Sequence, residues 1–176
     1  MTSNDSGVYV GAGALRNSDV FTAIRVIASD LASNPIEYDD KKLTTLLNKA
    51  PNNHMTAWAF KFSLVANMLL NGNSFARIDR NNSSQITGFT LIPNSQMVVK
   101  LDDASGKVSY TYTPPEGHAQ RLEPTDVLHF KCFTQDGYTG LSPLYSLRDE
   151  VTIQKAGNKL LTGFFKSGVQ GTGLLK

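Results

Sequence analysis

The sequence predicts an α+β fold, in which helices and strands occupy separate parts of the chain. Residues 18–72 carry apolar side chains at the three- to four-residue spacing of amphipathic helices. Residues 74–133 instead form short runs with alternating side chains, separated by turn residues, as antiparallel hairpins do. A second helical pattern follows Pro143. Because strands do not alternate with helices, a parallel sheet with crossover helices is not expected.

Composition and charge limit the classes of protein to which the chain can belong. The 176 residues are 40% hydrophobic and 18% charged, which is ordinary for a globular protein and sufficient for one well-packed domain. We expect this domain to span residues 17–176, after a flexible arm of residues 1–16. The net charge of +2 does not indicate that the domain as a whole binds nucleic acid, so any DNA contact would be local.

Cysteine and histidine usage argues against a disulfide or a metal centre. Cys132 is the only cysteine, which excludes an internal disulfide and fits a reducing compartment. His54 and His118 have no carboxylate or cysteine at metal-ligand spacing. The N-terminus lacks the pattern of a signal peptide, and no apolar run approaches the ~20 residues of a membrane span. We therefore expect no cofactor, no metal and no membrane contact.

The first element is predicted to be an amphipathic helix with Ser18 as its N-cap, ending before Pro35. Its expected inward side chains follow the helical period: Val20, Ile24, Ile27, Ala28 and Leu31. A short strand is expected at residues 36–38. A short helix is expected at residues 41–49, with three inward leucines, Leu43, Leu46 and Leu47.

The central core element is predicted to be a helix with Thr56 as its N-cap and Gly72 as its stop. Its side chains are apolar nearly all the way round, which is typical of a buried helix. Strands follow, in two hairpins and one further strand: 74–79 with 85–91, 97–101 with 108–113, and 127–133. The predicted fold therefore packs amphipathic helices on antiparallel hairpins.

The last helix is predicted to begin with Ser142 as N-cap and Pro143 at its first position, and to end before Gly168. These limits give a helix of about 24 residues. Half of its circumference is apolar, which predicts a buried face. On the other side the spacings of 7, 4 and 7 residues align a basic stripe: Arg148, Lys155, Lys159 and Lys166.

The basic stripe has two interpretations. Charges at helical spacing usually form a solvated helix face. Like charges in a row repel one another, however, and a phosphate backbone or an acidic neighbouring subunit would relieve that repulsion. The stripe is therefore a possible contact for DNA or for another subunit, and a DNA-binding module is one alternative function.

A small cysteine hydrolase is the other alternative, because His129 and Cys132 lie three residues apart, with Asp126 just upstream. Side chains three residues apart on a strand point to opposite faces, so the pair fails if 127–133 is a strand. We expect Cys132 to be a small core residue instead. The loop 137–142 precedes a helix and could hold an anion, but Pro143 removes one N–H group, which favours a tight connection.

Several short segments occur in a specific combination. They are 20–28, 46–52, 69–76 and 128–130, then Gly137 with Gly140-Leu141-Ser142-Pro143-Leu144, and finally Phe164-Phe165-Lys166-Ser167-Gly168 with Gly173-Leu174-Leu175-Lys176. In this order they resemble the opening half of tailed-phage portal proteins of the HK97 type. The resemblance extends from about Val20 to the end of the sequence.

The resemblance implies a structural subunit without a catalytic site, and a wing-like α+β domain as its fold. Portal subunits form a ring, commonly of about twelve copies, at one vertex of the capsid. Double-stranded DNA passes through the ring, and the terminase, the major capsid protein and the head–tail connector proteins are its partners. The resemblance places the protein in the virion, and in the host cytoplasm during assembly. The chain corresponds to the N-terminal wing portion, and the stem, clip and crown regions of the family lie outside it.

Overall fold

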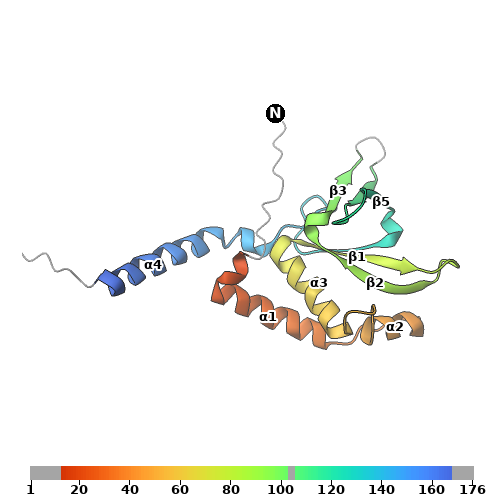
Figure 1. Ribbon diagram of the computed structural model, residues 1–176, viewed down its shortest axis with the longest axis horizontal. Coiled ribbons are helices and arrows are strands. Elements are labelled where there is room, and N and C mark those ends of the chain that lie inside the picture. Colours follow the sequence, from red (N-terminus) through yellow and green to blue (C-terminus); the bar gives the residue numbers. More distant parts are fainter. Residues whose placement is uncertain (1–12, 103–105, 168–176) are drawn as a thin grey trace, which may run out of the picture. The chain divides into compact units, whose positions relative to one another are not determined.

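The computed structural model describes residues 13–102 and 106–167 of the chain (Figure 1). The described residues fall into two compact units, one within Met1–Pro143 and one within Leu144–Lys176. The predicted arm, residues 1–16, lies outside the described residues except for its end, where Ala14–Arg16 form a short 3-10 helix, η1. That residues 17–176 form a single domain remains a prediction.

Helices α1, Ser18–Ser33, α2, Lys41–Asn48, and α3, Ala57–Asn71, precede the strands, as predicted. The N-cap of α1 is Asn17, one residue before the predicted Ser18, because the Asn17 side chain accepts the N–H groups of Asp19 and Val20 at 3.0 and 3.1 Å. The Thr56 hydroxyl caps α3 as predicted, and Gly72 ends α3 at φ 78°. Local capping chemistry therefore sets the ends of these helices.

The buried face of α1 is narrower than predicted. Its buried side chains are spaced every four residues: Val20, Ile24, Ala28 and Ala32. Ala28 and Ala32 are almost fully buried, and their small side chains allow α1 and α3 to pack closely. Ile27 and Leu31 are instead 45% and 50% exposed, so their predicted burial was wrong. The α1–α3 contact covers only one side of the apolar stripe.

Residues 36–38 do not form the predicted strand. The side-chain amide of Asn48 instead takes the place of a neighbouring strand for Ile36. Asn48 Oδ1 accepts the Ile36 N–H at 2.9 Å, and Asn48 Nδ2 donates to the Ile36 carbonyl at 2.7 Å. An extended backbone segment can thus satisfy its polar groups without joining a sheet.

The strands form two three-stranded antiparallel sheets. Strands β1, Asn73–Arg80, and β2, Ile86–Ile92, make the first predicted hairpin. Strands β3, Met97–Leu101, and β4, Val108–Tyr112, make the second. Strand β6, Val127–Lys131, pairs with β1, so the first sheet has the order β2-β1-β6. Strand β5, Gln120–Leu122, was not predicted; the second sheet has the order β3-β4-β5. Short 3-10 helices precede β3 and β6: η2, Asn94–Gln96, and η3, Pro124–Asp126.

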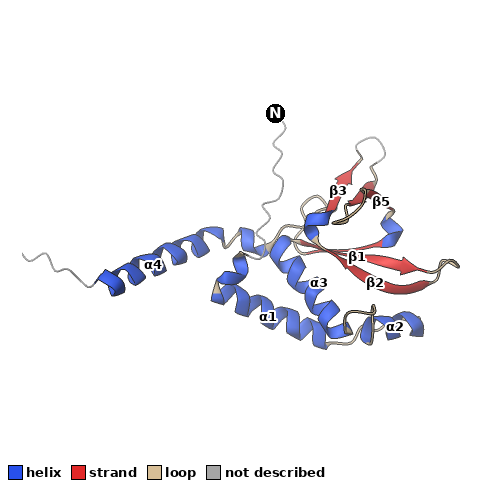
Figure 2. Cartoon of the chain, in the orientation of Figure 1, coloured by secondary structure: helices blue, strands red, loops and turns tan. Residues whose placement is uncertain are grey.

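The first unit has three layers, because the sheet β2-β1-β6 is covered on both faces. Toward the helices, Ala76 and Phe89 pack against Phe60 and Leu64 of α3. Toward the second sheet, residues of the alternate face pack together: Phe75, Ile92, Met97, Tyr110 and Val127. Figure 2 shows α1, α2 and α3 on one side of β1 and β2, and β3 and β5 on the other. The two side-chain faces of β1 thus belong to two different cores.

The second unit contains helix α4, Arg148–Ser167, which is shorter than predicted. Pro143–Tyr145 form a 3-10 helix, η4, in place of the expected first turn. The hydroxyl of Ser142, the predicted cap, donates to the carbonyl of Leu69 in α3 at 2.7 Å. Among the described residues, no helix has the length and hydropathy that a membrane crossing requires.

Candidate functional site

The predicted basic stripe lies on helix α4, which is exposed. All four residues, Arg148, Lys155, Lys159 and Lys166, lie within its 20 residues. At 100° per residue their backbone positions fall within about 40° of one another, as the sequence predicts. Lys159 and Lys166 are exposed. Asp149 and Glu150 occupy the first turn and Lys166 the last, an order that complements the helix dipole.

The opposite side of α4 is apolar and also exposed. Phe165 is 87% exposed and Ile153 is 72% exposed. Leu160, Leu161 and Phe164 are exposed as well. The prediction that this face is buried in the chain itself was therefore wrong for the described residues. A row of large apolar side chains in contact with water is typical of a surface that binds another protein.

Residues 69–76 and 137–143, which lie in segments that resemble portal proteins, contact each other within the first unit. A Cβ atom built at Gly72 would overlap the carbonyl of Gly140, and one built at Gly140 would overlap the carbonyl of Gly72. The Gly72 carbonyl also accepts the N–H of Cys132 at 2.8 Å. Only glycine permits two backbone segments to come this close.

The side chain of Asn73 holds this contact together. Its Oδ1 accepts the Gly140 N–H at 2.8 Å, and its Nδ2 donates to the Gly140 carbonyl at 2.9 Å. The orientation of the amide is therefore fixed. His129 Nε2 lies 2.8 Å from the same Oδ1, so Nε2 must be the donor. His129 Nδ1 then accepts from the Tyr110 hydroxyl at 3.2 Å.

This network keeps His129 neutral. Burial, with a smaller contribution from the nearby Lys131, lowers the pKa of His129 to about 4. Burial also raises the pKa of Tyr110, which keeps its hydroxyl protonated as a donor. The His129 ring contacts the Phe75 ring at a centroid distance of 4.5 Å. The histidine thus joins β6 to β1 and β4 and serves the fold.

The cysteine hydrolase alternative finds no support in this geometry. Both ring nitrogens of His129 are engaged by Tyr110 and Asn73, and Cys132 is a half-buried free thiol. Val127 packs between the sheets, and Leu128 packs toward the helices. Strand β6 ends at Lys131, two residues short of the predicted strand, so Cys132 lies just beyond the alternating segment and the argument against the pair rests on the occupied nitrogens of His129.

The loop 137–142 is a tight connection, as predicted, since the N–H groups of residues 137–141 bond within the protein. Asp136 accepts the N–H groups of Tyr138 and Thr139 at 2.9 and 2.7 Å. Thr134 Oγ1 accepts the Gly137 N–H at 2.8 Å. Slight desolvation raises the pKa of Asp136, but hydrogen bonds from Thr139, Tyr138 and Thr134 outweigh it and lower the pKa to about 2. An anion would have to displace these internal acceptors.

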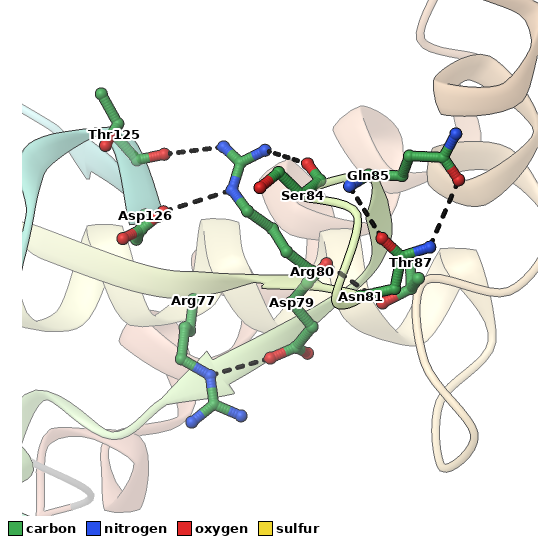
Figure 3. A network of polar contacts seen from close by, with 9 residues as sticks. All are labelled: Arg77, Asp79, Arg80, Asn81, Ser84, Gln85, Thr87, Thr125 and Asp126. Atoms are coloured by element: carbon green, nitrogen blue, oxygen red, sulfur yellow. Dashed lines mark hydrogen bonds and ion pairs between the residues drawn. The ribbon is translucent and has the colours of Figure 1, made fainter.

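Figure 3 shows a polar network that braces the β1–β2 hairpin against η3. The Arg80 guanidinium donates to Asp126 at 3.2 Å, to the Thr125 carbonyl at 3.2 Å and to the Ser84 carbonyl at 3.1 Å. At the hairpin turn, Asn81 Oδ1 accepts the N–H of Gln85 at 2.9 Å. The Arg80 network is a structural brace, because its polar groups bond to one another.

No pattern in the sequence predicts that Asn73, Gly140 and Tyr110 belong to one hydrogen-bond network. By itself, Asn73 after a glycine is typical of a turn. Its partners His129 and Gly140 are 56 and 67 residues away, so no local pattern links them. The available signal was indirect, since an Asn-Gly-Asn run and a Gly-Leu-Ser-Pro run both interrupt apolar segments.

His129, Asp136 and Arg80 hold parts of the fold together, and the exposed surfaces of α4 are apolar and basic. Such a combination is typical of a structural subunit that acts by assembly. The family model described as phage portal protein matches residues 18–176. The chain therefore belongs to the phage portal protein family, whose members are structural.

Known relatives agree with this assignment. The portal protein of Enterobacteria phage HK97 is 26% identical over 174 residues, covering 92% of this chain and 40% of that protein. A chain in the neck of an empty gene transfer agent particle, computed with C6 symmetry, is similar with a TM-score of 0.77 at 19% identity, covering 100% of this chain and 53% of that one.

Two further solved structures share the fold. One is a chain in the neck of the native gene transfer agent particle, computed with C12 symmetry. Its TM-score is 0.76 at 22% identity, and the similarity covers 99% of this chain and 51% of that one. The other is an HK97-family phage portal protein from Corynebacterium diphtheriae. Its TM-score is 0.62 at 19% identity, and the similarity covers 96% of this chain and 53% of that one. The chain thus spans about half the length of these relatives.

Proposed function

We propose that this chain is the wing portion of a portal subunit, a structural part of the ring at the capsid vertex through which double-stranded DNA is packaged and ejected. The observation that carries the proposal is the family match over residues 18–176, which extends across both compact units. The similar chains in neck structures computed with C6 and C12 symmetry support a ring.

In this proposal the chain binds copies of itself, and the complete ring docks terminase, the major capsid protein and the head–tail connector proteins. The ring belongs to the virion and assembles in the host cytoplasm. The role is mechanical rather than enzymatic. This is supported by the structural use of His129, both of whose ring nitrogens are engaged by other side chains.

The basic stripe on α4, Arg148, Lys155, Lys159 and Lys166, is proposed to contact an acidic surface in the assembly, either DNA or a neighbouring subunit. Support comes from the exposure of Lys159 and Lys166. Four cations along one helix face repel one another in isolation, and an anionic partner would offset that repulsion.

The proposed ring is tested by measuring the mass of the purified full-length protein by light scattering over a range of concentrations. We expect a species with a mass near twelve chains, and images of this species should show rings. A mass equal to one chain at every concentration, with no rings in the images, would contradict the proposal. The measurement needs no assumption about which surfaces meet.

A further inference from the structure

An apolar groove opens between α1, α3 and β6 in the first unit. Its volume is about 290 Å³, and the side chains around it include Leu31, Leu64, Met68, Leu128 and Phe130. Lys61 is the one charged residue that lines it, and its ammonium group is directed to the Asn34 carbonyl at 2.6 Å. The groove therefore offers apolar contact without hydrogen-bonding groups for a ligand.

The size of the groove also argues against a small molecule as its occupant. Pockets for drug-sized ligands have volumes of roughly 300–1,000 Å³ and combine apolar walls with a few placed polar groups. This groove lies just below that range and lacks those groups. A few large side chains from a helix would fill it, which is the manner in which helices dock into grooves.

Helix α4 carries such side chains. Leu160 and Phe164, four residues apart, lie on one side of the helix and are exposed. They border a shallow depression on α4 together with the small residue Ala156 and the cation Lys159. Apolar anchors at this spacing, flanked by small residues, can enter a groove together because the helix backbone can come close.

We propose that the apolar face of α4 in one copy of the chain docks in the groove of the first unit of the next copy. This inference rests on the proposed ring. A closed ring larger than a dimer is built from heterologous contacts, in which two different patches of each subunit meet. The groove and the α4 face are two such patches, and both are apolar.

Charge at the rims agrees with this pairing. Asp30 and Glu37 are exposed, and they directly precede and follow the groove residues Leu31 and Ile36 in the sequence. Lys159 is exposed and directly precedes Leu160 on α4. If Leu160 enters the groove, Lys159 comes close to the segment of the chain that carries Asp30 and Glu37. Opposite charges at the edge of an apolar contact steer two subunits into register.

Disulfide trapping in the assembled protein tests the contact. Cys132→Ser removes the native thiol, after which Ile36→Cys places a thiol in the groove and Leu160→Cys places one on α4. Mild oxidation of the oligomer should produce a ladder of covalent species on a denaturing gel, since each copy offers one thiol to each neighbour. Ile36→Cys with Thr162→Cys is the matched control, because Thr162 lies on the other side of α4. The control should give no ladder.

Each outcome decides the inference. A ladder from the Leu160 pair alone supports it. A cross-linked single chain would show that α4 occupies its own groove, and equal ladders from both pairs would show random collision; either overturns it. An intact ring without a ladder overturns the inference but leaves the proposed function standing. A protein that forms no ring contradicts the proposed function as well.

A second variant guards against failure of the cysteine proteins to assemble. Leu160→Glu places a charge on the apolar face of α4, and it should lower the association constant of the oligomer at least about tenfold. Thr162→Glu adds the same charge to the polar side and should assemble like the unchanged protein. Equal assembly of both variants would overturn the inference.

Discussion

At the residue scale, Gly72 and Gly140 show why two distant turns require glycine. Gly72 has φ 78°, and any Cβ at either position would overlap a backbone carbonyl of the other segment. Backbone atoms cannot yield as the tip of a flexible side chain can. The contact, together with the bonds of Asn73, ties the end of α3 to the loop before Pro143.

We predict that Gly140→Ala lowers the free energy of unfolding by about 2–4 kcal/mol, because the new methyl group forces the two segments apart. Urea denaturation followed by circular dichroism measures this change. Gly157→Ala is the matched control, since a Cβ there meets no atom within 4 Å, and alanine favours a helix by about 1 kcal/mol. Equal stability of Gly140→Ala and the unchanged protein would show that the glycine contact is not required.

At the element scale, His129 joins three strands, because it bonds Asn73 of β1 and Tyr110 of β4 from its place in β6. The neutral ring fits this arrangement and the imidazolium does not. Protonation would give Nδ1 a hydrogen directed at the donating Tyr110 hydroxyl, and Lys131 adds unfavourable positive charge. The link between the sheets therefore depends on the protonation state of one residue.

This link predicts a specific pH dependence of stability. Since the pKa of His129 is about 4 in the folded protein and about 6.5 when unfolded, the unfolded chain binds more protons between these values. Stability is fully present above pH 6.5 and is lost as the pH falls toward 4. Because the ring is partly exposed, we expect a loss on the order of 1–2 kcal/mol.

The measurement compares unfolding free energies at pH 7 and pH 4 for the unchanged protein and for His129→Gln, which cannot titrate. The variant should lose less stability over this interval. Asp136 does not affect the comparison. Its pKa is lowered to about 2 in the folded protein, so the stability that its ionised form contributes is present above pH 4 and is lost as the pH falls toward 2. The same loss in both proteins would assign the effect to other groups.

At the scale of the whole molecule, the exposed apolar and basic surfaces matter more than any single residue. Most of the stability of a helix in a protein comes from packing of its apolar face, and the large apolar side chains of α4 are exposed. A partner surface would stabilise the helix. The groove of the first unit is the complementary surface that we infer.

We predict that Lys159→Glu weakens the oligomer at low salt and that adding Asp30→Lys restores it, because the pair reverses both charges. Light scattering at low and high ionic strength measures the effect, which salt should reduce. Lys100→Glu, an exposed change on β3, is the control and should leave assembly unchanged. If Lys159→Glu instead weakens only duplex DNA binding, the stripe is a DNA contact.

Much of the fold could be predicted from local patterns. The ends of α3, both hairpins and strand β6 follow from cap residues, glycine stops and the period of apolar side chains, all of which act over a few residues. The location of the basic stripe on one helix followed from its spacing in the same way.

Other features needed the tertiary structure, because they depend on partners far away in the sequence. The Asn48 amide replaced the expected strand at Ile36, and the Ser142 hydroxyl donates to the carbonyl of Leu69, 73 residues away in the sequence. Helical periodicity correctly identified the apolar side of α4, yet only the packed structure decided that this side is exposed. Periodicity reports which side chains share a face, whereas burial requires a second surface of matching shape.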